Sequence, residues 1–143
     1  RKIYQAGPLF SDAERSWHGK LSERLRAAGH SVVWPGDLLT SDQIKAAGPG
    51  AIALIFETCR NALIAYLRVA LLDGTQVDDG TAWEIGYAYA KGLPIFGIRT
   101  DFRQGGDTQF NHVNSMIEGC LYGLATDVDG LLLMMCAASC SGK

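Results

Sequence analysis

The stretch that decides the fold runs from residue 67 to residue 91 and reads LRVALLDGTQVDDGTAWEIGYAYAK. Its first part, Leu67–Leu72, is a mostly apolar run, which is typical of a strand buried on both faces. Its last part, Thr81–Lys91, has the pattern of a helix, and a turn rich in aspartate and glycine joins the two. The stretch therefore predicts one strand-loop-helix unit of an α/β protein.

The same unit recurs on both sides of this stretch. Further strands are expected at Lys2–Ala6, His30–Trp34, Ile95–Ile98 and Leu121–Ala125, and further helices at Ser11–Ala28, Thr40–Ala65, His112–Cys120 and Val128–Ala138. The helical segment Thr40–Ala65 is interrupted at Gly48-Pro49-Gly50. Strict alternation requires right-handed crossovers between parallel strands, so we expect helices on both faces of the sheet. The prediction is a doubly wound, flavodoxin-like five-stranded parallel sheet of order 2-1-3-4-5, with residues 1–143 forming a single domain.

The composition and the net charge limit the kinds of partner that the protein can bind. A formal net charge of −2 over 143 residues provides no basic field for a polymeric nucleic acid, so a small ligand fits better. The apolar stretches are too short to cross a bilayer and no signal segment opens the chain, which predicts a cytoplasmic protein without a membrane partner. The four cysteines lack C-x-x-C spacing and the three histidines are scattered, so neither a metal nor another cofactor is implied.

Two loops hold the unusual polar residues of the chain. In a sheet of this order, ligands bind where the strand order reverses, beyond the carboxyl ends of the first and third strands. The loops there are Gly7–Ser11 and Asp73–Thr81, and the second leads to Glu84. Gly7 allows a ligand to approach the backbone, and Phe10 could stack on a base or belong to the core. The first loop matches neither a P-loop nor a dinucleotide fingerprint.

Clustered carboxylates around Glu84 suggest glycosidic chemistry. A retaining transfer needs an ionised carboxylate that attacks the anomeric carbon. We expect Glu84 in the first turn of its helix, where the helix dipole would keep its pKa low. Thr81-x-x-Glu84 also fits a capping box, as do Ser11-x-x-Glu14 and Thr40-x-x-Gln43, and on pattern alone the capping role is favoured. Asp78 and Asp79 equally fit ordinary turn positions.

Four motifs in register resemble the nucleoside 2-deoxyribosyltransferase family. They are IYQAGPLFS at residues 3–11, LLDGTQVDDGTAWEIGYAYAKGLP at 71–94, GIRTDFR at 97–103 and NSMIEG at 114–119. The resemblance covers nearly the whole chain and agrees with the predicted fold. It implies that Glu84 attacks C1′ of a 2-deoxynucleoside and forms a deoxyribosyl ester, which a second free nucleobase then cleaves. The partners implied are thus 2-deoxynucleosides and nucleobases.

The resemblance also assigns roles to other residues. Tyr4 would hydrogen-bond and orient Glu84, Asp78 would hold a sugar hydroxyl, and Asp73 would line the same pocket. Asn114 and Met116 match a segment that the family supplies from a neighbouring subunit, which implies a homo-oligomer with shared active sites.

The chain departs from the family pattern on the base side. Family members often carry an aspartate on the helix before the third strand as a proton donor, whereas this chain reads FETCRNA at residues 56–62. Glu57 and Asn61 are the candidates for that role. Two alternatives stay open: a deoxynucleoside 5′-monophosphate N-glycosidase of the same fold, and a non-catalytic nucleotide-sensing module in which Glu84 is only a cap. The first loop offers no cationic group for a phosphate, which favours an unphosphorylated nucleoside.

Overall fold

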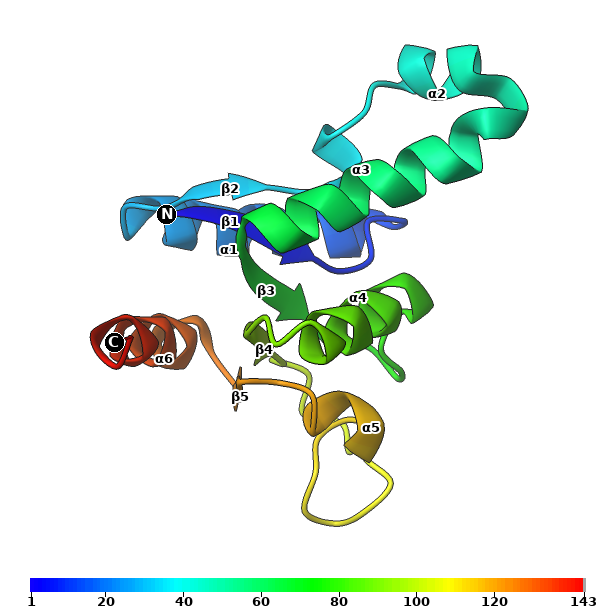
Figure 1. The fold of residues 1–143 in the computed structure, drawn as a ribbon. Helices are drawn as coiled ribbons and strands as arrows, with labels where there is room; N and C mark the ends of the chain where they lie inside the picture. The colour runs from blue at the N-terminus through cyan, green and yellow to red at the C-terminus, as the bar shows by residue number, and fades with distance from the viewer. Residues whose placement is uncertain (143) are drawn as a thin grey trace.

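The computed structural model describes residues 1–142 and contains one parallel sheet with the strand order β2-β1-β3-β4-β5 (Figure 1). The strands are β1 (Lys2–Ala6), β2 (Ser31–Val33), β3 (Leu67–Leu71), β4 (Ile95–Ile98) and β5 (Gly123–Ala125). All four neighbouring pairs are parallel. The predicted fold class is therefore confirmed, and the strand order reverses between β1 and β3 as expected.

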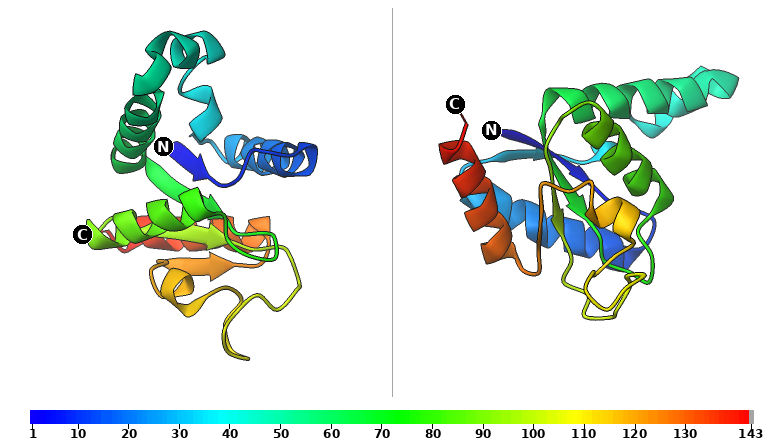
Figure 2. Two further views of the ribbon diagram at one scale, coloured as in Figure 1. Left: turned by 90° about the vertical axis from the view of Figure 1, so that its right-hand side faces the viewer. Right: turned by 60° about the horizontal axis from the view of Figure 1, so that its bottom comes forward.

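Helices cover both faces of this sheet (Figure 2). They are α1 (Asp12–Ala27), α2 (Ser41–Ala47), α3 (Ala51–Ala65), α4 (Asp79–Ala90), α5 (Ser115–Glu118) and α6 (Val128–Cys140), with short 3-10 turns at Pro35–Asp37 and Gly48–Gly50. In Figure 1, α2 and the first turns of α3 extend beyond the sheet. Within the described residues no helix combines the length and apolarity needed to cross a membrane.

Each face of the sheet has its own apolar core. On one face, Leu21 and Leu25 of α1 pack with Leu131 and Met135 of α6. On the other face, Leu63 of α3 and Ile85 of α4 pack with strand residues that include Tyr4. Because side chains alternate along a strand, neighbouring residues of β1 serve opposite cores. Tyr4 therefore lies on the same side of the sheet as α3 and α4.

Local signals explain where the helices begin. The capping boxes Ser11–Glu14 and Thr40–Gln43 are both formed, so α1 begins after Ser11 and α2 after Thr40. The break predicted at residues 48–50 separates α2 from α3. The helix predicted from residue 112 begins only at residue 115, because the Asn114 side chain caps it there by accepting from the Met116 amide.

Strand β3 contains one charged residue, Arg68, that is only 6% exposed. Its guanidinium donates to backbone carbonyls at the end of α3 and before β4, namely those of Leu63, Ile64, Tyr66 and Pro94. The carbonyls of Leu63 and Ile64 lie in the last turn of α3, where they have no partner within the helix, so the arginine satisfies them while they solvate its charge. A charged residue is thus compatible with a strand buried on both faces.

Candidate active site

Glu84 lies in the second turn of α4, and it does not form a capping box with Thr81. The helix begins at Asp79, and the residue that caps it is Asp78. The Asp78 carboxylate accepts from both the amide and the hydroxyl of Thr81, each at 3.0 Å. The expected position of Glu84 in the first turn was therefore wrong. Glu84 has no part in starting the helix, so the capping role that the pattern alone favoured is removed.

The Glu84 side chain faces a cleft of about 310 Å³ at the point where the strand order reverses. Its wall is built by the loop after β1, the segment that follows β2, one side of α3 and the start of α4. Apart from Asp78, Thr81 and Glu84, the wall is mostly apolar, with Leu39, Ile44 and Ile55 among its residues. A mostly apolar cleft with a few convergent polar groups is the usual form of a small-molecule site.

Tyr4 approaches Glu84 from strand β1. The tyrosine is fully buried, and its hydroxyl, like the Oε2 atom of Glu84, makes no hydrogen bond within residues 1–142. Burial raises the pKa of Tyr4, and the negative charge of Glu84 raises it further. The structure thus places the hydroxyl beside the carboxyl, close enough for each group to shift the pKa of the other, although the pair does not reach regular hydrogen-bond geometry. Two buried polar groups without partners are costly, and a ligand can supply such partners.

The protonation of Glu84 differs from the sequence-based expectation. Burial raises the pKa of the carboxyl from 4.5 to about 7, the Tyr4 hydroxyl opposes this increase, and the charge of Asp78 adds to it. A carboxyl outside the first turn gains little from the helix dipole, whereas loss of hydration acts wherever it is buried. Carboxyl groups that lie in clefts and have shifted pKa values are typical of functional sites. Glu84 is therefore about half ionised near neutral pH.

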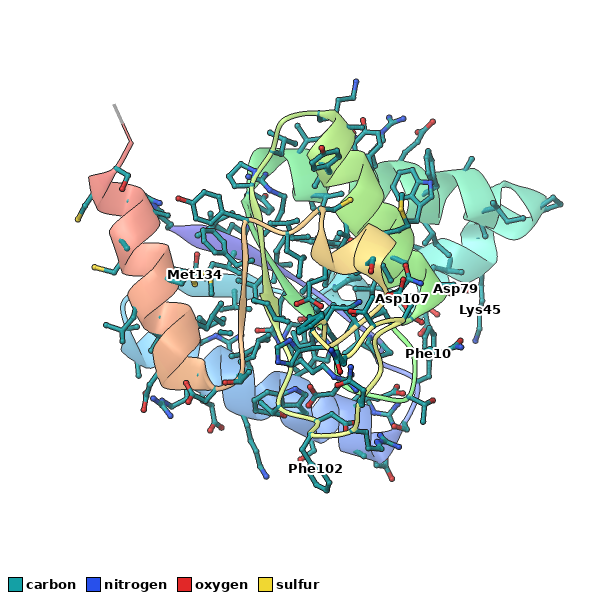
Figure 3. All side chains as sticks on the ribbon, turned by 90° about the horizontal axis from the view of Figure 1, so that it is seen from below. Phe10, Lys45, Asp79, Phe102, Asp107 and Met134 are labelled. Atoms are coloured by element: carbon teal, nitrogen blue, oxygen red, sulfur yellow. The ribbon has the colours of Figure 1, made fainter. Side chains whose placement is uncertain are left out.

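The loop after β1 forms one wall of the cleft and is held from behind. A β-carbon on Gly7 would lie 2.7 Å from Nε2 of His18, so only glycine fits there. His18 is itself fixed, because Gln5 donates to its Nδ1 atom at 2.9 Å and burial lowers the pKa of the imidazole to about 4. Phe10 is 81% exposed and points outward at the cleft rim (Figure 3). Phe10 is thus available to a ligand and is not a core residue.

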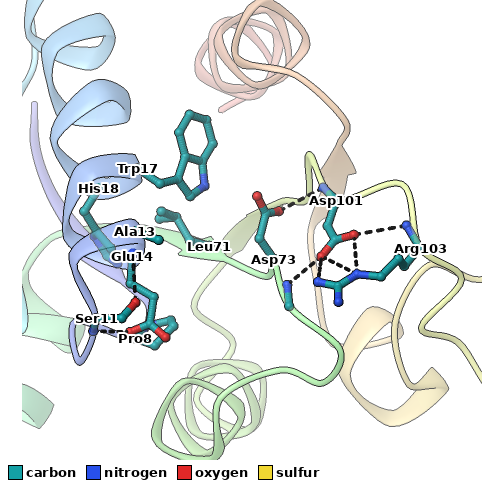
Figure 4. Close-up of a pocket in the computed structure, with 11 residues that line it drawn as sticks. Pro8, Ser11, Ala13, Glu14, Trp17, His18, Leu71, Asp73, Asp101 and Arg103 are labelled. Atoms are coloured by element: carbon teal, nitrogen blue, oxygen red, sulfur yellow. Dashed lines mark hydrogen bonds and ion pairs between the residues drawn. The ribbon is translucent and has the colours of Figure 1, made fainter.

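Asp73 does not line the Glu84 cleft, which corrects the expectation that it would. It accepts from the amide and the hydroxyl of Thr100 at 2.6 and 2.5 Å and so ties the end of β3 to the end of β4. It lines a separate cavity of about 360 Å³ near α1, together with the Asp101–Arg103 ion pair (Figure 4). Its carboxylate already accepts hydrogen bonds from backbone and side-chain donors, so Asp73 has a structural role.

Asn114 and Met116 also lie outside the Glu84 cleft of the same chain. Asn114 caps α5 and lines a cavity formed with the loop after β4, and Met116 is 80% exposed. Within one chain, the structure thus brings together Glu84, Tyr4, Asp78, Gly7 and Phe10 and leaves these two residues apart.

The helix before β3 presents a cysteine to the cleft. Cys59 lines the cleft, whereas Glu57 and Asn61, the two candidates for the base side, are exposed and line no part of it. Helical spacing accounts for this result, because Ile55 and Cys59 lie four residues apart on the face of α3 that borders the cleft. The described residues contain no cluster of three His, Cys, Asp or Glu side chains that could hold a metal ion.

Fold and cleft together define the class: a doubly wound α/β protein with a partly buried carboxyl at its topological switch point. The sequence model of the nucleoside 2-deoxyribosyltransferase family matches residues 3–130, and the chain belongs to this family.

Solved structures share this fold. The chain is similar to a conserved protein from Enterococcus faecalis V583, with 30% identity over 96% of this chain and 98% of that one, and a TM-score of 0.71. It is similar in fold to a 2-deoxyribosyltransferase from Bacillus psychrosaccharolyticus, with 23% identity, coverage of 90% and 88%, and a TM-score of 0.73. The fold is shared with a CMP N-glycosidase from Clostridium botulinum, with 16% identity, coverage of 96% and 99%, and a TM-score of 0.56. No curated protein gave a significant match.

Proposed function

We propose that the protein transfers 2-deoxyribose between nucleobases and that Glu84 is the nucleophile. The observation that carries this proposal is the Glu84 carboxyl itself, which lines the cleft beside the fully buried Tyr4 hydroxyl. Asp78 lies in the same cleft and uses its Oδ2 atom for the helix cap. Its Oδ1 atom accepts no hydrogen bond within residues 1–142 and can accept one from a sugar hydroxyl. Family membership supports the same substrate class.

The proposed reaction has two displacements at one carbon. The ionised Glu84 attacks C1′, the bond from C1′ to the base nitrogen breaks, and the base leaves with the electron pair and takes up a proton. A ring nitrogen of the second base then attacks C1′, the ester bond breaks, and the carboxylate is restored. Each step inverts C1′, so the overall transfer retains configuration. The Tyr4 hydroxyl can donate to the carboxylate and orient it for attack.

The hydrolase alternative would require a site for a phosphate. The Glu84 cleft has no lysine or arginine in its wall among the described residues, and Arg60, which lines the adjoining cavity between α3 and α4, lies over the ring of Phe56. A phosphate that gained no cationic partner would lose hydration without compensation. This observation favours an unphosphorylated nucleoside over a nucleoside monophosphate. The non-catalytic alternative becomes weaker as well, because Asp78 and not Glu84 caps α4.

We further propose that the active enzyme is a homo-oligomer in which Asn114 and Met116 of one copy complete the cleft of another. In support, Met116 is exposed and Asn114 lies outside the cleft of its own chain.

The test is to incubate the protein with a 2-deoxynucleoside, with and without a second free base, and to follow the products by chromatography. Base exchange without net hydrolysis supports the transferase, and free deoxyribose or its phosphate supports the hydrolase. No turnover of any 2-deoxynucleoside or its monophosphate would reject both enzymes.

Glu84→Gln gives a sharper test, because glutamine is nearly isosteric but cannot form the ester. The intact-mass increase of one deoxyribosyl group should occur in the wild type and be absent in this variant. The matched control is Glu23→Gln, which changes an exposed glutamate on α1. Full activity of Glu84→Gln would contradict the proposed mechanism.

A further inference from the structure

Cys59 occupies a junction between two cavities that both reach Glu84. One is the cleft of about 310 Å³, and the other is a cavity of about 320 Å³ between α3 and α4 whose wall includes Phe56, Arg60 and Trp83. The walls of the two cavities share only Ile55, Cys59, Gly80 and Glu84 among the described residues. A ligand that extends from one cavity into the other therefore passes the side of α3 that carries Ile55 and Cys59.

The immediate surroundings of Cys59 are polar on one side only. Its thiol lies near the Tyr4 hydroxyl, which is fully buried and makes no regular hydrogen bond within residues 1–142, and near Glu84. Burial raises the pKa of the thiol and Glu84 raises it further, so the group stays an uncharged S–H near neutral pH. An uncharged thiol behaves as a small apolar group with a weak donor.

The remaining wall on this side of the cleft consists of aliphatic side chains. Ile55 lies one turn before Cys59 on α3, and Leu39 and Ile44 come from the segment after β2. Asp78 comes from a different element, the start of α4. If Asp78 binds the sugar, as the proposed function holds, a base at C1′ that extends away from the start of α4 and toward α3 meets the wall that contains Cys59. This wall has no strong hydrogen-bonding side chain with which to read the edge of a base.

We propose that Cys59 is a specificity-determining residue that contacts the nucleobase and selects it by size. The inference rests on the proposed function for the orientation of the substrate. In an apolar pocket, one methylene group changes discrimination by roughly 10- to 200-fold. The volume of the side chain at position 59 therefore sets how well a two-ring base is accepted relative to a one-ring base.

The test compares kcat/KM for 2-deoxyadenosine and thymidine in Cys59→Met and Cys59→Ala. We expect Cys59→Met to lower the purine-to-pyrimidine ratio by about tenfold or more, and Cys59→Ala to raise it. Cys136→Met is the matched control on the exposed part of α6, and its ratio should equal that of the wild type. Equal losses for both substrates in the Cys59 variants would indicate a merely structural role and overturn the proposal.

A second measurement needs no turnover. In Glu84→Gln at pH 9, where part of the Cys59 thiol is ionised, N-ethylmaleimide adds to the thiolate, forming a carbon–sulfur bond while the adjacent maleimide carbon takes up a proton from water. Saturating 2-deoxyadenosine should slow this reaction at least tenfold, while alkylation of Cys136, followed by peptide mass, stays unchanged. Protection without base exchange by the wild type would reject the transferase and retain the contact with Cys59. If the wild type exchanges bases but 2-deoxyadenosine does not protect Cys59, the proposal fails and the transferase stands.

Discussion

Replacing Glu84 by glutamine should stabilise the folded protein, and only at high pH. The pKa of this carboxyl rises from 4.5 to about 7 on folding because the group is buried. An acid with a raised pKa binds its proton more tightly in the folded state, so the protein loses stability as the pH rises from the unfolded to the folded pKa. A shift of this size corresponds to up to about 3 kcal/mol above pH 7. Glutamine does not titrate and escapes this cost.

The assay is urea unfolding of wild type and Glu84→Gln across the pH range, followed by circular dichroism at a fixed protein concentration. We expect Glu84→Gln to be more stable by up to about 3 kcal/mol at pH 8.5, and by less than about 1 kcal/mol at pH 5. Glu23→Gln should show no pH-dependent difference, because this glutamate is exposed. A difference that is absent, or that stays constant with pH, would refute the claim that burial governs the ionisation of Glu84.

Three further predictions concern the cleft. The rate of base exchange should rise with pH and level off above about pH 7 in a pH–rate profile, because only ionised Glu84 can attack. A rate that falls through this range would contradict the role of Glu84 as the nucleophile. Asp78→Asn keeps an oxygen for the cap but removes a charge that raises the Glu84 pKa, so the acidic limb of that profile should move to lower pH. Gly7→Ala should cost about 1–3 kcal/mol in urea unfolding and reduce exchange, because its β-carbon would approach His18 to 2.7 Å; Gly86→Ala, where a β-carbon meets open space, is the control.

The fold could be predicted because its signals are local. The run Leu67–Leu72 is buried in almost any arrangement, and Gly48-Pro49-Gly50 interrupts a helix by its own chemistry. The capping box at Ser11 fixed the start of α1 in the same way. The start of α4 was harder to predict, because Asp78-x-x-Thr81 and Thr81-x-x-Glu84 both resemble caps. Only the path of the loop after β3 makes Asp78 the residue that caps the helix.

The chemistry of the site depended on tertiary contacts that the sequence pattern does not contain. The pKa of Glu84 follows from the packing of β1 and α3 around it, which brings Tyr4 and the cleft wall to the carboxyl. The phase of α3 against α4 turns Cys59 inward and leaves Glu57 and Asn61 exposed. A shift of about two residues along the helix would exchange them, and no local motif specifies this phase.

The packed loop after β1 limits how the protein can be redesigned. Gly7 is in contact with His18, which is linked through Gln5 and Ser22 to Trp34, so a change on this inner side disturbs a chain of buried hydrogen bonds. Phe10, three residues further on, faces solvent at the rim. A mutant library that aims at new substrates should therefore diversify the rim at Phe10 and leave the inner side of the loop unchanged.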